Sequence, residues 1–339
     1  MPEERNHHLL PPPLSVGRLA GIDAARFVSA VAVLWIHTAE SATGQSWIPI
    51  CRVAVPFFTV SMVFLTLSHY LRHTSDDNWV LFAMRRFNRL YVPFLLWSLV
   101  YLGLRFLKHQ IVTSGSQPIV LSPATLVTGT AHHLWFLPFA FFVTLMVYPA
   151  RRIYSRSPVR QLRMWGALFF LVGLIFSAVP CPVMVEAVEH PVTYFIGMSW
   201  AALPAVFYGG AAAALLPSLP GSATAWVGGV GFVLVGVLLP FEGMFANLQC
   251  LGGLFLWMVA QNRLSFVDPV LVTAAGAVSF SLYLTHVAVV ECLQVIAKKM
   301  DLVTSIQTDL AVGVTALAAS LLLVVQGQRF KCLRPLFPL

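Results

Sequence analysis

The chain has 339 residues, of which 58% are hydrophobic and only 10% are charged, and its mean hydropathy is +0.80. Because soluble globular domains carry about a quarter charged residues, this composition excludes a soluble domain and predicts an all-α protein that crosses a membrane many times. The formal net charge of +8 requires no nucleic-acid partner, since basic cytoplasmic loops and anionic lipid headgroups account for it.

Ten apolar runs are long enough to cross the hydrocarbon core as helices, so we expect a bundle of about ten transmembrane helices. The first run follows a polar, proline-rich stretch and has no small-residue cleavage site. We therefore expect it to stay as a helix and not to act as a removed signal peptide. The runs are 22–41, 51–71, 90–108, 134–153, 164–180, 198–217, 223–240, 244–261, 270–295 and 308–328.

Lysine and arginine residues gather on one side of this predicted bundle. With a cytoplasmic N-terminus, the inner side holds fifteen of them and the outer side five, and Arg26 lies inside the first helix. Because positive charge is retained in cytoplasmic loops, this distribution predicts that both termini are cytoplasmic. The chain then consists of an N-terminal tail, 1–20, a transmembrane domain, 21–330, and a C-terminal tail, 331–339.

The first helix combines apolar residues with Asp23, Arg26, His37 and Glu40, which fall within a sector of about 100°. A charge in the bilayer core costs at least about 2.5–3.5 kcal/mol, so this polar stripe predicts a functional site that faces a protected cavity. Eleven residues separate Arg26 from His37, which at ~1.5 Å per residue is about 16 Å along the axis. We expect Asp23 to pair with Arg26, because unpaired charges at that depth are disfavoured.

A second basic cluster lies at the start of the third predicted helix. Arg86 and Arg89 share a face there, at the depth of Arg26. Guanidinium groups bind phosphates through paired hydrogen bonds, so the three arginines predict a site for a phosphate-bearing ligand from the cytoplasm. The alternative is a basic loop that sets topology and binds lipid headgroups, and the charges leave both interpretations open. The basic run 151–156 has no apolar partner motif, and we assign it to topology.

Histidines mark the outer half of the predicted bundle. His132 and His133 precede Trp135 at the fourth helix, where an aromatic belt is the simpler interpretation. In the ninth helix, Ser279, Tyr283 and His286 lie on one face, and His286 has the predicted depth of His37. Two histidines at matched depth, with His132 or His133 nearby, favour a shared cavity.

Five segments in chain order together resemble the acyltransferase-3 family of integral membrane acyltransferases, which modify cell-surface sugars. They are Asp23-x-x-Arg26 followed by His37; Val55-Pro56-Phe57-Phe58; Arg86-x-x-Arg89 before Tyr91-x-Pro93; His133-Leu134-Trp135-Phe136-Leu137; and Ser281-Leu282-Tyr283-Leu284-Thr285-His286. The second segment departs from the family pattern, because Met62 follows Ser61 where the family has glycine. We expect a short, membrane-only member, and whether a separate protein completes transfer is left open.

The resemblance implies a multi-pass O-acyltransferase of the plasma membrane, which is the inner membrane in a bacterium. Its co-substrate is expected to be an acyl-CoA, most simply acetyl-CoA, on the cytoplasmic side. The acyl group would pass to a hydroxyl of a cell-surface sugar, polysaccharide or glycolipid. His37 has the position of the family's general base, and Arg26, Arg86 and Arg89 would hold the CoA phosphates.

Other residues are expected to support this chemistry. Glu40, one turn beyond His37, would orient that ring or contact the acceptor. Hydrogen bonds to the carbonyl oxygen or to sugar hydroxyls are expected from His133, Tyr283 and His286. Nothing in the sequence suggests a metal. Expected partners are membrane lipid and the carbohydrate or glycolipid acceptor, and a second copy of the chain or polysaccharide-assembly proteins are left open.

Two other functional classes compete with this hypothesis. A transporter or flippase for an anionic lipid or oligosaccharide also needs buried Arg, Asp and His, but it usually shows paired repeats and broken helices, which this sequence lacks. A membrane-bound O-acyltransferase of the other large histidine-dependent family fits less well, because the histidine here lies in the first helix. Motifs for ATP hydrolysis, zinc proteolysis and elbow-type serine hydrolysis are absent.

Overall fold

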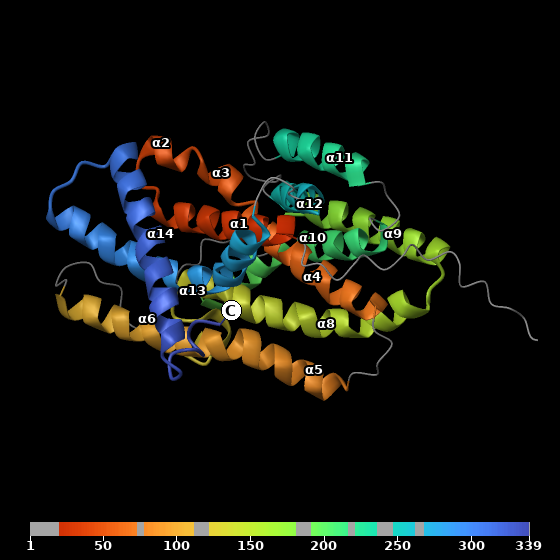
Figure 1. Cartoon of the computed structure of the whole chain (residues 1–339), viewed down its shortest axis with the longest axis horizontal. Coiled ribbons are helices and arrows are strands. Elements are labelled where there is room, and N and C mark those ends of the chain that lie inside the picture. Colours follow the sequence, from red (N-terminus) through yellow and green to blue (C-terminus); the bar gives the residue numbers. More distant parts are fainter. Residues whose placement is uncertain are drawn as a thin grey trace, which may run out of the picture.

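A computed structural model of the chain describes residues 20–72, 78–111, 122–180, 191–215, 221–235, 247–261 and 268–338. Within these residues the secondary structure is helical, without a strand, and Figure 1 shows the helices gathered into one bundle. The predicted all-α class is confirmed. Eight helical stretches are long and apolar enough to cross a membrane, which agrees with a polytopic bundle.

The helices of the first half follow the predicted order closely. They are α1 (Ala20–Thr38), α2 (Ala42–Gln45), α3 (Ile48–Cys51), α4 (Ala54–Arg72), α5 (Trp79–Arg86), α6 (Val92–Ile111), α7 (Thr125–Thr128) and α8 (Phe136–Arg156). A π-helix, η1 (Phe87–Tyr91), joins α5 to α6, and a 3-10 helix, η2 (His132–Trp135), leads into α8.

The second half contains α9 (Val159–Ala178), α10 (Pro191–Leu215), α11 (Gly221–Val233), α12 (Gln249–Ala260), α13 (Pro269–Lys299) and α14 (Ile306–Arg329). In place of the predicted runs 223–240 and 244–261 the structure has α11 and α12, with 13 and 12 residues. Residues 236–246 and 262–267 lie outside the described part, so the count of ten spans and the cytoplasmic termini stay predictions.

The first helix occupies the centre of the bundle. It packs against α4, α12, α13 and α14, while α4 in turn packs against α8, α10 and α12 (Figure 1). Polar groups on α1 are therefore placed among other helices and not only against lipid. This position gives Asp23 and His37 the protected surroundings that the sequence predicts for the polar stripe, whereas Glu40 lies beyond the end of α1 and is exposed.

Close helix approach in the core depends on glycine. A Cβ atom at Gly253 of α12 would lie 2.5 Å from the Pro56 Cβ and 2.6 Å from the Phe57 backbone nitrogen. A side chain at this position would push α12 away from α4. Small residues at membrane helix interfaces permit this kind of backbone contact, and here they bring α12 next to the helix that borders α1.

The C-terminal segment folds back into the bundle after α14. The Trp97 indole Nε1 donates a hydrogen bond of 2.7 Å to the Leu336 carbonyl, and the Ser281 hydroxyl donates one of 2.7 Å to the Pro338 carbonyl. Phe337 is buried and packs edge-on against Trp97. Over residues 331–338 the predicted tail is thus held between α6 and α13, which the apolar pattern alone did not indicate.

Candidate active site

Three imidazole rings from three distant parts of the chain form a triangle. The ring centres of His37 and His286 lie 5.3 Å apart, those of His133 and His286 5.3 Å apart, and those of His37 and His133 5.9 Å apart. They come from the last turn of α1, from the middle of α13 and from η2. The structure therefore brings together the histidines for which a shared cavity is predicted, and the third ring of the triangle is His133 and not His132.

The three rings differ in their access to solvent and to ligands. His286 is fully buried and His133 is 5% exposed, whereas His37 is only partly buried. His37 is thus the most exposed ring of the cluster. The other two rings lie behind it and form part of its surroundings.

The hydrogen bonds of His286 suggest its tautomer. Its Nδ1 lies 3.2 Å from the Leu282 carbonyl oxygen, which only accepts hydrogen bonds, so we assign the proton to Nδ1. The other ring nitrogen, Nε2, then has a lone pair, and it has no hydrogen-bond partner among the described residues. This assignment leaves the cluster with one unprotonated ring nitrogen that has no partner among the described residues.

Two tyrosines contact His133, and both also hold or belong to α13, the helix that carries His286. The Tyr283 hydroxyl donates to the His133 carbonyl, and the two rings lie 5.7 Å apart. Tyr101 of α6 lies 5.1 Å from His133, edge-on. Its hydroxyl donates to the Leu284 carbonyl at 2.9 Å and accepts from the Ala288 backbone N–H at 3.1 Å, so it lies between two groups of one α13 turn.

The end of α1 is held by α13 and α14. Gln294 of α13 donates a hydrogen bond of 3.1 Å to the His37 carbonyl. Asp309 of α14 is 3% exposed and accepts from the backbone N–H groups of Glu40 and Ser41 at 3.2 and 3.0 Å, and from the Ser41 hydroxyl at 2.5 Å. This carboxylate fixes the chain where it leaves α1, directly after the candidate base.

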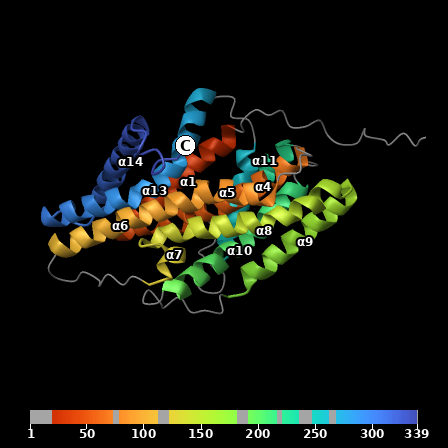
Figure 2. The ribbon, with the colours of Figure 1, turned by 90° about the horizontal axis from the view of Figure 1, so that it is seen from below.

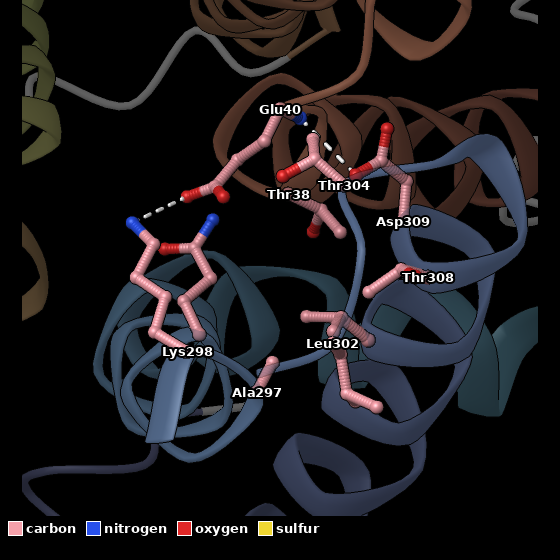
Figure 3. A pocket seen from close by; sticks show the side chains of 10 residues that line it. Thr38, Glu40, Ala297, Lys298, Leu302, Thr304, Thr308 and Asp309 are labelled. Atoms are coloured by element: carbon pink, nitrogen blue, oxygen red, sulfur yellow. Dashed lines mark hydrogen bonds and ion pairs between the residues drawn. The ribbon is translucent and has the colours of Figure 1, made fainter. Parts of the chain in front are cut away.

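Glu40 lies outside α1 and points toward α13 (Figure 3). Its carboxylate accepts a hydrogen bond of 3.1 Å from the Lys298 ammonium group, as the dashed line in Figure 3 shows. Both side chains line a small pocket near the end of α1. The structure thus pairs Glu40 with Lys298 and does not bring its carboxylate to the imidazole cluster.

Asp23 and Arg26 form the expected pair near the other end of α1. Arg26 Nη1 lies 3.4 Å from Asp23 Oδ1, and the Asp23 side chain is 7% exposed against 27% for Arg26. Gly276 of α13 makes room for this carboxylate, because a Cβ atom there would lie 2.5 Å from the Asp23 Cβ. No pattern in the sequence indicates this role for Gly276.

Arg86 lies beside α4, where its Nη2 donates a weak hydrogen bond of 3.4 Å to the Thr66 hydroxyl. Arg89 is exposed and lies in the π-helix η1. Arg86 therefore borders α4, which packs against α1, the helix that carries Arg26. Convergence of the three guanidinium groups on one ligand stays a prediction.

One basic residue that we assigned to topology is part of the folded core. Arg151 is 8% exposed, and its guanidinium group lies 3.8 Å above the Tyr148 ring. Tyr148 packs at 4.6 Å against Phe82, above which Arg86 lies at 5.1 Å. Arg151 and Arg86 thus flank the same aromatic pair.

The remaining predicted residues contact other protein groups. Trp135 is buried and packs against Phe136 and Phe139. Ser279 donates its hydroxyl to the Gly276 carbonyl of its own helix, and exposed His132 lies against Tyr194. Among the described residues, no group of three or more His, Cys, Asp or Glu side chains is arranged to hold a metal ion.

Comparison with known protein families identifies the domain. The family model described as an acyltransferase domain matches residues 19–325, which is most of the chain. The chain belongs to the acyltransferase-3 family. Searches of curated proteins and of solved structures returned no match.

The matched acyltransferase domain contains all three cluster histidines and the residues that hold them. Tyr101, Gln294 and Asp309, which sequence reasoning missed, also lie within it. Each is a polar residue inside an apolar helix, and that was the only available signal. The C-terminal segment 331–338 lies beyond the match.

Proposed function

We propose that this membrane acyltransferase transfers an acyl group, most simply acetyl, from acyl-CoA to a hydroxyl of a cell-surface sugar, polysaccharide or glycolipid. The observation that carries the proposal is the imidazole triangle, with a partly exposed His37 in front of two buried rings, inside a matched acyltransferase domain. Neutral imidazole takes and returns protons near physiological pH, which suits acyl transfer to an alcohol.

In the proposed reaction, His37 removes the proton from the acceptor hydroxyl as its oxygen attacks the thioester carbonyl carbon. A carbon–oxygen bond forms and the carbon–sulfur bond breaks. The proton then passes from His37 to the departing thiolate, so that the products are an ester and free CoA. Among the predicted donors to the carbonyl oxygen, Tyr283 already gives its proton to the His133 carbonyl and therefore acts through the position of η2.

The donor is proposed to bind from the cytoplasm, with its phosphates at Arg26, Arg86 and Arg89. Arg26 is partly exposed, and Arg89 is exposed next to Arg86. Along α1, Arg26 and His37 are separated by about 16 Å at ~1.5 Å per residue. The pantetheine arm would bridge this separation, which places the thioester near the imidazole cluster and the acceptor at the predicted outer end.

The test uses inverted membrane vesicles that contain the protein, so that the cytoplasmic face is on the outside. Radiolabelled acetyl-CoA, which does not cross membranes, is added to the outside. We expect label to enter the glycan or lipid fraction with the native protein and with His132→Asn, whose ring is exposed outside the cluster. We expect about a 10²–10⁴-fold loss with His37→Asn. Equal transfer by His37→Asn at equal protein level would contradict the proposed base.

The competing transporter hypothesis predicts a different outcome in the same vesicles. It predicts no transfer from any acyl-CoA, together with a His37-dependent movement of a labelled lipid or oligosaccharide. If acetyl-CoA fails, propionyl-CoA and succinyl-CoA test the identity of the acyl group. Mass spectrometry of surface glycans from cells with and without the gene then identifies the acceptor by a lost acyl mass.

A further inference from the structure

A pocket of about 270 Å³ lies between α6 and α13, next to the imidazole cluster. Figure 2 shows these two helices running side by side toward the same end of the bundle. The lining residues are spaced three and four apart on each helix, so each helix contributes one continuous face. The mechanism proposed above does not use this pocket.

The inner boundary of the pocket reaches the candidate active site. Tyr101 lines the pocket and lies 5.1 Å from the His133 ring. Ala131 and Ala288 also line it, two residues away from His133 and His286. A ligand in the pocket would thus have one end beside the cluster.

The walls of the pocket are mostly apolar and open toward the side of the bundle. Leu104 and Val295 line it from the two helices, while Leu107 and Ile296 are 54% and 52% exposed. Side chains this exposed on membrane-spanning helices meet lipid. The pocket is therefore accessible to a hydrocarbon chain from the bilayer.

Two cationic side chains also line this pocket. Arg105 and Lys108 share a face of α6, and Lys108 pairs with Glu291 of α13 at 3.3 Å. Arg105 has no ion pair among the described residues. With two cations and one carboxylate, the pocket has a net positive charge that favours binding of an anion. A guanidinium group is well suited to bind phosphate.

Because the walls are mostly apolar and two cationic side chains line them, we infer that this pocket binds a lipid phosphate that carries the acceptor sugar. The inference rests on the proposed acyl transfer and specifies its acceptor: the lipid chain lies between α6 and α13, its phosphate contacts Arg105, and the sugar hydroxyl reaches His37. The acceptor then enters laterally from the predicted outer leaflet of the bilayer, while the acyl-CoA donor enters from the cytoplasm.

The native Cys292 provides a direct measure of occupancy. Cys292 lines the pocket and is exposed, so a maleimide can label it. The protein would carry alanine at Cys51, Cys181, Cys250 and Cys332 and would be placed in phosphatidylcholine nanodiscs. Polyprenyl phosphate is the probe, and polyprenol, inorganic phosphate and phosphatidylglycerol are its comparisons.

We expect polyprenyl phosphate at about ten times its Kd to slow labelling of Cys292 about tenfold, because only unoccupied protein reacts. Polyprenol and inorganic phosphate should protect much less, since polyprenol lacks the phosphate and inorganic phosphate lacks the hydrocarbon chain. Arg105→Gln should abolish most of the protection, and Lys299→Gln, an exposed cation on the same end of α13 outside the pocket, should preserve it.

Equal protection by phosphatidylglycerol would overturn the inference, because it would show a surface for any anionic lipid. The absence of protection by polyprenyl phosphate would overturn it as well. This measurement needs no turnover. If protection fails while His37-dependent transfer is observed, the proposed function stands without this pocket; if protection holds and no transfer occurs from any acyl-CoA, the proposed function is wrong.

Discussion

At the scale of single residues, His286 has no direct access to ligands, yet it shapes the surroundings of His37. Its ring is fully buried, 5.3 Å from His37, and is held by the Leu282 carbonyl. With its proton on Nδ1, His286 has a lone pair on Nε2 without a hydrogen-bond partner among the described residues, and a hydrogen bond from His37 to this atom would set the tautomer of the His37 ring. We therefore regard His286 as a positioning residue for the proposed base.

This role predicts the kinetic behaviour of His286→Asn. We expect kcat to fall, by less than the roughly 10²–10⁴-fold loss expected for His37→Asn, because the base itself is retained. The KM for acetyl-CoA should hardly change, since the phosphates are predicted to bind at the other end of the bundle. Steady-state kinetics with acetyl-CoA in nanodiscs measure both constants, and a change confined to KM would contradict the assignment.

Gly276 provides a stability test at the Asp23–Arg26 pair. In Gly276→Ala the new Cβ would lie 2.5–2.6 Å from three atoms of Asp23, so α13 or the carboxylate must shift. Overpacking of this kind costs about 1–3 kcal/mol, and we expect a lower Tm. The matched control is Gly103→Ala in α6, where nothing lies within 4 Å of the new Cβ. A Tm for Gly276→Ala equal to that of the control would contradict the close packing.

At the scale of elements, the turn after α1 depends on a single buried carboxylate. Asp309 accepts three hydrogen bonds from the segment 40–41, and Gly44 lies so close that a Cβ there would meet Asp309 Oδ2 at 2.2 Å. Since α2 begins at Ala42, the carboxylate fixes both the end of α1 and the start of the following helix.

Asp309→Asn should loosen this turn, because the amide replaces one acceptor oxygen by a donor that faces other donors. Hydrogen bonds to charged groups contribute about 1.5–3 kcal/mol, so we expect clearly faster amide hydrogen exchange over residues 39–47 and unchanged exchange in α9 and α10. Asp301→Asn, an exposed neighbour whose positive φ suits asparagine, is the control. Unchanged exchange at 39–47 in Asp309→Asn would show that the carboxylate is dispensable.

The C-terminal segment is a second element whose position depends on few contacts. Phe337 is 8% exposed and fills the space left by Gly327, where a Cβ would lie 2.2 Å from its ring. Removal of a buried phenylalanine side chain costs about 3–5 kcal/mol, more than a short segment can lose and stay docked. We expect Phe337→Ala to expose residues 331–338 to carboxypeptidase, and Phe330→Ala, at 58% exposure, to leave them protected. Equal digestion of the two variants would contradict the docking.

At the scale of the whole molecule, apolar length and periodicity predicted the spanning helices, because a helix in lipid must satisfy its own backbone. The histidine cluster was also predictable, since polar residues in apolar runs gather inside a bundle. The contacts that orient those residues were not. Tyr101, Gln294 and Asp309 depend on which helices become neighbours, and Gly276 on the exact approach of α13 to α1. Pairing of Glu40 with Lys298 likewise follows from tertiary contacts, which periodicity does not encode.

The arrangement of the whole molecule separates the arginines from the imidazoles, and this separation leads to the last prediction. If Arg86 holds a CoA phosphate, Arg86→Gln removes one charge-assisted hydrogen bond of about 1.5–3 kcal/mol, which corresponds to a rise in Kd of roughly ten- to hundredfold. Arg160→Gln is the control, because it removes an exposed arginine from the start of α9. Isothermal titration with CoA measures both variants.

Truncated ligands show whether the lost energy belongs to a phosphate contact. Pantetheine lacks every phosphate, so it should bind equally to the native protein and to Arg86→Gln, and 3′-dephospho-CoA identifies whether the ribose phosphate is the partner. Because the predicted site lies at the opposite end of α1 from His37, His37→Asn should bind CoA like the native protein while it fails to transfer the acyl group. A pantetheine affinity that falls as much as the CoA affinity in Arg86→Gln would show that Arg86 supports the fold between α4 and α5 and does not bind the donor.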